Sequence, residues 1–235
     1  MRKVLLLVPI GLLVVLAAAV LLYTKVIADD PPDRLTFSDS TTTTVAGGAA
    51  PTTGSATSPP SGSLEGTWKV APASQAGYRV KEILFGQSVT AVGRTDAVTG
   101  EMSIRGTTVS TGSFSVDLTK VKSDREQRDG QFQGRIMNTA RFPTARFVLS
   151  SPISLSSLPE GNAATTVPAK GMLTLKDRTN DVSFSLQARR NGANIEVNGT
   201  IPVRFADYGI DNPSGGPARV GDDGEVEVLL VFAKA

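Results

Sequence analysis

The chain has 235 residues, of which 40% are hydrophobic and 20% are charged, and its formal net charge is +2. It contains no Cys and no His, which excludes disulfides, thiol catalysis, Ser-His-Asp catalysis and the usual structural zinc sites. The near-neutral charge argues against a nucleic-acid-binding protein, because such a protein carries a strongly basic surface. We therefore expect a protein that is not an enzyme and has no catalytic residues, no metal or cofactor and no nucleic-acid partner.

The first segment of the chain is apolar. Val4–Tyr23 is a run of 20 residues without a charged side chain, and as a helix it would match the bilayer hydrocarbon, about 30 Å thick. Arg2 and Lys3 precede it, so the positive-inside rule places residues 1–3 in the cytoplasm and the C-terminal part outside. The sequence predicts a single-pass transmembrane signal anchor over residues 4–26. The alternative is a signal peptide cleaved after Ala28, which would make the protein secreted.

A region of low complexity follows the apolar segment. In Ser38–Ser63, 20 of the 26 residues are Ser, Thr, Gly or Pro. Such a composition cannot bury enough apolar surface to offset the entropy lost on ordering the chain. We therefore predict a disordered linker over residues 27–63, acting as a flexible stalk between the membrane and the folded domain.

Period-2 alternation of apolar and polar residues, typical of half-buried strands, recurs between residues 64 and 235. It is clear in Ser113–Leu118 and Val182–Gln187, weaker in Ile195–Asn198, and it begins a last strand over Glu225–Phe232. Asn191-Gly192 predicts a hairpin turn, and Gly221–Gly224 predicts a similar turn before the last strand. Further strands are expected at Thr67–Val70, Tyr78–Leu84, Ser88–Arg94, Glu101–Arg105, Arg146–Ser150 and Met172–Lys176.

Only Ser123–Asn138 breaks this β pattern. It is polar, with Phe132, Ile136 and Met137 at helix-like spacing, so we expect a short helical excursion there. Arg128 and Asp129 are adjacent and do not face each other on a helix, so we expect them to form ion pairs that tie the excursion to the sheet. Many antiparallel strands with one excursion predict an all-β barrel or sandwich, and a barrel of about eight strands can hold one small ligand.

Six short motifs in a fixed order carry a resemblance to a known family. They are Trp68–Val70, Ser74–Val80, Ser123–Asp129, Ile136–Pro143, Gly171–Leu175 and Phe205–Ile210. With them, the domain resembles the YceI-like family of secreted, lipocalin-like barrels that bind polyisoprenoid lipids, and in particular a membrane-anchored actinobacterial member. The resemblance implies an antiparallel lipocalin-like β-barrel of about eight strands over residues 64–235. Gln75 or Ala76 stands where many members have a His, and Phe205 or Ala206 where many have an Arg.

The resemblance also implies an isoprenoid lipid as the bound ligand, held in an apolar tunnel. The alternating apolar faces would point into this tunnel, and the helical excursion would form its mouth or lid. Without the resemblance, the same parity would fit side chains that fill a solid core. The expected lining residues are Tyr78, Val80, Phe114, Val116, Phe132, Ile136, Met137, Phe142, Leu175, Phe184 and Leu186.

A function of a different class stays open. A solid-core barrel could serve as an interaction or stress-response module that acts through its surface. Leu229–Val231, where the last strand is apolar on both faces, would then be a partner surface or the interface of a homodimer.

Overall fold

The structure, a computed structural model, describes residues 31–37, 63–155, 158–159, 161 and 163–235. The predicted cytoplasmic segment (residues 1–3), the predicted transmembrane anchor (residues 4–26), and residues 27–30 and 38–62 of the predicted linker lie outside these ranges. Within the described ranges, no helix is long and apolar enough to cross a membrane.

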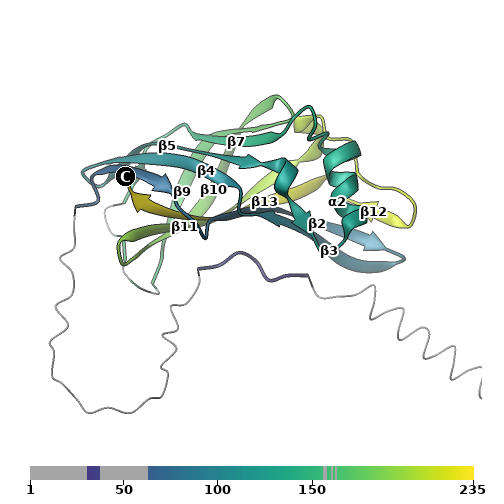
Figure 1. Cartoon of the computed structure of the whole chain (residues 1–235), viewed down its shortest axis with the longest axis horizontal. Helices are drawn as coiled ribbons and strands as arrows, with labels where there is room; N and C mark the ends of the chain where they lie inside the picture. The colour runs from purple at the N-terminus through teal and green to yellow at the C-terminus, as the bar shows by residue number, and fades with distance from the viewer. Residues whose placement is uncertain (1–30, 38–62, 156–157, 160, 162) are drawn as a thin grey trace, which may run out of the picture.

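Eight antiparallel strands close into a barrel (Figure 1). Two of them are kinked and consist of two consecutive segments each: β1 (Gly66–Val70) with β2 (Gln75–Leu84), and β3 (Gln87–Thr95) with β4 (Val98–Arg105). β13 closes the ring, because it pairs with β11 on one side and with β1 and β2 on the other. The remaining strands of the ring are β5 (Thr108–Asp117), β7 (Thr144–Leu149), β9 (Thr165–Leu175), β10 (Arg178–Asn191), β11 (Asn194–Arg204) and β13 (Asp223–Lys234).

Short elements add to this ring. β6 (Lys122–Ser123) pairs with β3, β8 (Ile153–Ser154) with β5, and β12 (Ala218–Val220) with β2. The helical segments are η1 (Leu118–Lys120), α2 (Glu126–Gln131), the π-helical turn η2 (Phe132–Ile136) and η3 (Phe205–Tyr208). Figure 1 shows α2 and β12 together at one end of the barrel, opposite the end that carries the C-terminus.

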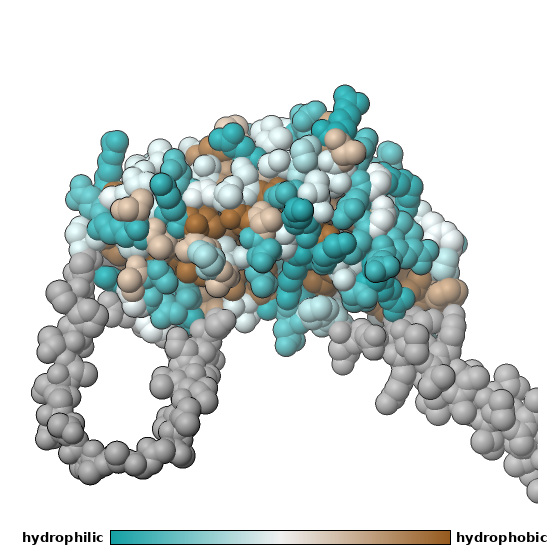
Figure 2. All heavy atoms as spheres, in the orientation of Figure 1, coloured by the Kyte–Doolittle hydropathy of each residue, from teal (hydrophilic) through white to brown (hydrophobic). Residues whose placement is uncertain are grey.

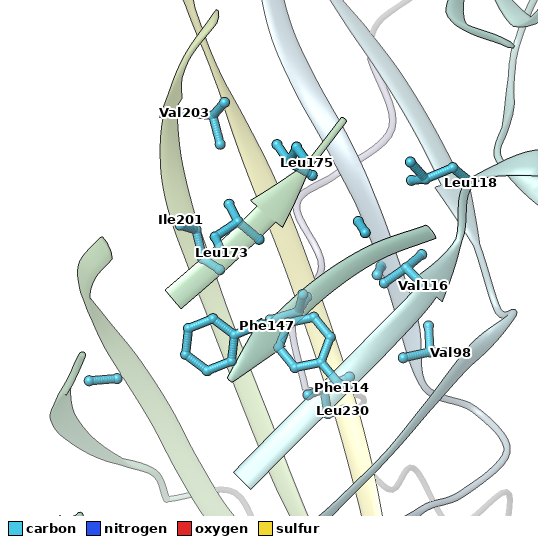
Figure 3. Packing of buried hydrophobic residues seen from close by; sticks show 14 of the residues in the cluster. Val98, Phe114, Val116, Leu118, Phe147, Leu173, Leu175, Ile201, Val203 and Leu230 are labelled. Carbon is cyan, nitrogen blue, oxygen red and sulfur yellow. The ribbon is translucent and has the colours of Figure 1, made fainter. Parts of the chain in front are cut away.

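The interior follows from strand parity, because every second side chain of a strand points to the same face. On β5, Phe114 and Val116 are buried, while Ser115 between them faces outward. Inside the barrel, Phe114 stacks on Phe147 of β7 (Figure 3). Their ring centroids lie 5.3 Å apart. Phe147 in turn meets Phe184 of β10 edge-on at 5.6 Å. These three rings form an aromatic layer inside the barrel.

The all-β antiparallel barrel and its short helical excursion are confirmed, and η3 is a further helical turn that the sequence did not predict. Each expected strand coincides with an observed one to within one residue of overhang, and Asn191-Gly192 forms the turn of the β10–β11 hairpin. Two expectations need correction. The turn at Gly221–Gly224 joins no hairpin, because β12 pairs with β2 and not with β13. In the predicted linker, Pro31–Phe37 packs on the barrel, with Leu35 buried.

Candidate functional site

The barrel holds a cavity of about 480 Å³ at the end covered by α2. This volume falls in the range of roughly 300–1,000 Å³ that is typical of small-molecule sites. Inward side chains of β2, β5, β9, β11 and β13 form its walls, and α2 and η2 cover it. The walls are mainly aliphatic and aromatic, so the space suits an apolar ligand.

Tyr78 of β2 is the aromatic centre of one wall. Its ring stacks on Phe132 of the excursion, with centroids 4.9 Å apart and planes 15° from parallel. Gly93, the partner of Tyr78 on β3, leaves room for this ring, because a Cβ there would lie 2.4 Å from Tyr78 Cε1. Burial raises the pKa of the Tyr78 hydroxyl above its ordinary value, so the phenol stays neutral at physiological pH. The wall therefore offers an aromatic face and an uncharged hydroxyl.

Ion pairs fasten the excursion over the cavity. Arg128 of α2 bonds to Glu82 of β2 at 3.1 Å and also to Asp124. The buried carboxylate of Asp129 accepts hydrogen bonds from the backbone N–H and the hydroxyl of Ser123, both at 2.7 Å. Asp129 also forms an ion pair with Lys122 of β6 at 3.5 Å, so the expectation that Arg128 and Asp129 form ion pairs tying the excursion to the sheet is confirmed. These contacts with the sheet hold the helical excursion over the cavity.

The mouth of the cavity lies where its lining reaches the surface. Phe85, in the β2–β3 turn, and Gln127 and Gln131 of α2 all line the cavity and are exposed. On the face shown in Figure 2, hydrophilic side chains predominate, with apolar atoms visible between them and at the edge of the α2 end. The charged residues of the lining carry two charges of each sign and give no net charge: Glu82, Arg125, Arg128 and Glu225.

A second, smaller cavity of about 80 Å³ lies toward the other end of the barrel. It shares no lining residue with the large cavity. Phe114 and Phe147 line the small cavity, whereas Val116 and Ala145, two residues further along the same strands, line the large one. The aromatic layer formed by Phe114, Phe147 and Phe184 therefore lies between the two spaces.

The structure divides the sequence-predicted lining residues into three groups. The large cavity is lined by Tyr78, Val80, Val116, Phe132, Ile136, Met137 and Leu175. The small cavity is lined by Phe114, Phe184 and Leu186. Phe142 lines neither cavity; it is half-buried, with the guanidinium of Arg141 4.9 Å from its ring centroid. The binding role of all these residues stays a prediction.

Several residues of the large cavity were not expected from the sequence. Phe205 and Ile210 line it from the segment around η3, and Val203 and Val226 line it from β11 and β13. Parity could have identified Val226, since it alternates with Glu225 and Glu227. Phe205 and Ile210 lie within one of the six motifs, which carried the resemblance but gave no side-chain direction.

The apolar segment Leu229–Val231 does not form one surface. Leu230 is buried and lines the small cavity, while Leu229 and Val231 are half-buried on the other face of β13. Alternation along the strand thus splits the patch that the sequence suggested as a partner or homodimer surface, and the homodimer stays a prediction.

A family model described as the YceI-like domain matches residues 68–232, and no match was found among the curated proteins. Among solved structures, the chain is similar to a polyisoprenoid binding domain from Saccharophagus degradans implicated in plant cell wall breakdown. That match has 18% identity and a TM-score of 0.59, and covers 73% of this chain and 99% of that one. It is also similar to Burkholderia cenocepacia BcnA, with 18% identity, a TM-score of 0.55, and coverage of 69% and 98%.

Proposed function

Because the chain belongs to the YceI-like domain family, we propose that it is an extracytoplasmic binding protein that holds a neutral polyisoprenoid-type lipid in the large cavity. The observation that carries the proposal is the apolar cavity of about 480 Å³ with a mouth at α2. The similar domain from Saccharophagus degradans, named as polyisoprenoid binding, supports this choice of ligand.

Burial of a hydrocarbon chain supplies the affinity in this proposal. Each buried CH₂ contributes about 0.8 kcal/mol, so a chain of about 20 carbons gains roughly 16 kcal/mol before costs. Immobilising ligand and side chains removes several kcal/mol of this gain. A charged headgroup contact is therefore not needed for binding.

The charges of the lining favour an uncharged ligand. Arg128 is already paired with Glu82 and Asp124, and the lining has no net positive charge to balance a phosphate or diphosphate. Burying an unbalanced anion beside apolar walls is costly. We therefore propose a lipid with a neutral end group, such as an alcohol or a quinone, over a phosphorylated one.

The proposed location rests on the sequence. The apolar run Val4–Tyr23 behind Arg2 and Lys3 would anchor the chain in the cell membrane, with the barrel outside. We propose binding, storage or transfer of the lipid at that surface as the role of the protein, not catalysis.

Native mass spectrometry of the full chain, released from detergent, tests the proposal. We expect a mass excess that solvent extraction identifies as a neutral isoprenoid lipid. Val80→Trp should abolish it, because the indole would occupy the large cavity that Val80 lines. Met172→Trp is the matched control, since Met172 is exposed and lines neither cavity. A bare protein mass that persists after addition of polyprenols would refute the proposal and favour the surface-acting module.

A further inference from the structure

The outer face of the barrel buries charged side chains. Glu227 of β13 points outward, because its neighbours Val226 and Val228 line the cavities, yet it is only 2% exposed. Arg94 of β3 bonds to it at 2.8 Å, and Arg79 of β2 at 3.4 Å. Charged residues on an outer face normally stay in water. Another segment of the protein must therefore cover Glu227 and its two arginine partners.

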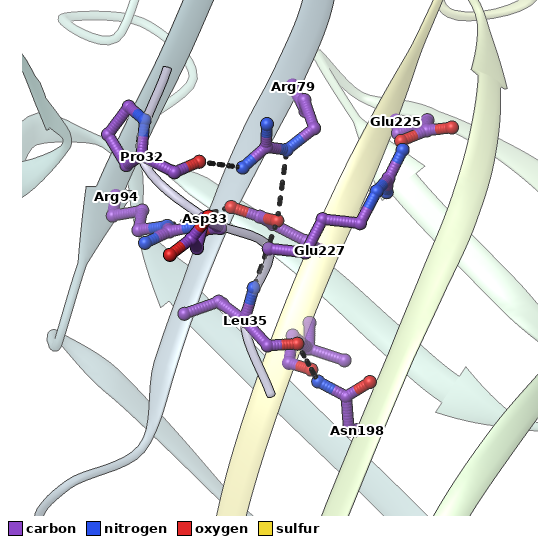
Figure 4. A network of polar contacts seen from close by, with 10 residues as sticks. Pro32, Asp33, Leu35, Arg79, Arg94, Asn198, Glu225 and Glu227 are labelled. Carbon is purple, nitrogen blue, oxygen red and sulfur yellow. Dashed lines mark hydrogen bonds and ion pairs between the residues drawn. The ribbon is translucent and has the colours of Figure 1, made fainter. Parts of the chain in front are cut away.

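The cover is Pro31–Phe37, which we call the strap. Figure 4 shows it lying across the strands, with Arg79 donating to the carbonyl of Pro32. Arg94 donates to the carbonyl of Asp33, and Asn198 of β11 donates to the carbonyl of Leu35. The Leu35 N–H in turn points to Glu227 Oε2 at 3.5 Å.

Further contacts hold both halves of the strap. Arg34 pairs with Glu225 at 2.7 Å, and the side chain of Leu35 is buried against the barrel. Phe37 stacks on Arg189 of β10, whose guanidinium carbon lies 4.5 Å from the ring centroid. The strap therefore crosses β3, β2, β13, β11 and β10. Four strand spacings amount to about 19 Å, which seven extended residues span.

The sequence suits this docking. Pro31 and Pro32 have no backbone N–H to leave unpaired and favour an extended chain. Gly77 lies between Glu227 and Arg94 in the register, and a Cβ there would lie 2.9 Å from Arg94 Cγ. The glycine thus opens the path by which Arg94 reaches Glu227.

The first residues of the strap lie on the wall of the large cavity. Pro32 contacts Arg79, and the neighbours of Arg79 on β2, Tyr78 and Val80, line that cavity from inside. Four residues further, about 13 Å along the strand, β2 reaches the turn beside the mouth. There Ile83 and Phe85 are 51% and 55% exposed.

We propose that the strap fastens the barrel beside the membrane, with the mouth and the apolar turn at Ile83–Phe85 facing the bilayer. This inference rests on the proposed membrane anchor. With the strap docked, seven residues (24–30) join the apolar run to the barrel, a reach of at most about 25 Å. With the strap released, 40 residues (24–63) would join them, with a mean end-to-end distance of about 35 Å and a far longer reach.

Hydrogen exchange on the full chain in lipid vesicles tests the docking. We expect the amide of Leu35, which points to Glu227 Oε2, to exchange at least about tenfold more slowly than in an unstructured peptide. Leu35→Asp should remove this protection, because it places a charge in the buried Leu35 position beside Glu227. Thr36→Asp adds the same charge at the neighbouring, exposed position and should leave it intact. Exchange of the Leu35 amide at the rate of an unstructured peptide in the unmodified chain would overturn the proposal.

A depth-sensitive fluorophore tests the orientation, and the absence of Cys allows single-site labelling. A label at Ile83→Cys should be quenched by spin-labelled lipid, whereas one at Met172→Cys, also exposed on the barrel, should not. Leu35→Asp should weaken quenching at position 83 by up to about tenfold, because effective concentration falls with roughly the −3/2 power of tether length. Equal quenching at positions 83 and 172, or no effect of Leu35→Asp, would overturn the orientation.

These experiments distinguish failure of the lipid-binding proposal from failure of the proposed strap and membrane orientation. If the full chain does not float with the vesicles, the anchor and this inference fall, while lipid binding is still read from the bound mass. If the strap is protected and position 83 is quenched but no lipid is bound, the inference stands and the lipid-binding proposal falls. If hydrogen exchange in the strap is slowed only when light scattering detects a dimer, docking within one chain is overturned.

Discussion

Removing the ring of Phe147 should join the two cavities and lengthen the lipid chain that the barrel can hold. Phe147 is buried between Phe114 and Phe184, in the layer that separates the spaces of about 480 and 80 Å³. Phe147→Ala should cost about 3–5 kcal/mol of folding stability, which includes both aromatic contacts. Typical domains have a free energy of unfolding of about 5–15 kcal/mol, so a domain in the upper part of that range would remain folded after this loss.

The assay is denaturant unfolding combined with native mass spectrometry after exposure to prenols of graded length. The variant should retain longer prenols than the unmodified chain, while its unfolding midpoint falls. Phe142→Ala is the matched control, because Phe142 lines neither cavity, and it should change neither property by much. If Phe147→Ala fails to fold, Phe147→Leu removes part of the ring at a lower cost. An unchanged length limit in a folded variant would refute the division of the interior by the aromatic layer.

Three further outcomes follow from the geometry. Glu227→Gln removes the carboxylate that pairs with Arg79 and Arg94, so it should lower the free energy of unfolding by about 3–5 kcal/mol in denaturant titration. Glu225→Gln is the control, because it changes the largely exposed pair with Arg34 and should cost under about 1 kcal/mol. Gly93→Ala should displace the Tyr78 ring and alter the near-ultraviolet circular dichroism, and an unchanged spectrum would contradict the tight fit. Because burial raises the pKa of Tyr78, the folded state keeps a proton that the unfolded state loses, so stability should fall as pH rises above about 10. Tyr78→Phe should weaken that fall in alkaline unfolding curves.

Strand alternation predicted most of the fold because the barrel has one apolar and one polar face. Val182–Gln187 lies in β10 and Ser113–Asp117 in β5, and their residues Phe114, Val116, Phe184 and Leu186 line the interior. The short strands β6, β8 and β12 were not expected, because two or three residues are too few to show a period. Both β1 and β2 pair with β13, a tertiary pairing that local sequence does not report.

The candidate site was predictable in its ingredients but not in its boundaries. Parity directs Phe114 and Val116 to the same interior, yet they line different cavities, because the height of each residue along the barrel axis decides. That height depends on strand stagger, which is a property of the closed sheet. The strap was missed for a different reason. Leu35 and Phe37 are single apolar residues in a polar stretch, and only the three-dimensional structure places Arg79, Arg94 and Glu227 beneath them.

The two faces of β2 connect these findings. On a strand, adjacent residues point to opposite sides, so Tyr78 and Val80 form the cavity wall while Arg79 receives the strap. A ligand that presses on the inner face and a strap that holds the outer face therefore act on the same three residues of backbone. The same strand ends in the exposed turn beside the mouth. In the proposed orientation, β2 receives the strap on its outer face at Arg79. The same strand leads from the exposed turn at the membrane surface to the cavity wall at Tyr78 and Val80.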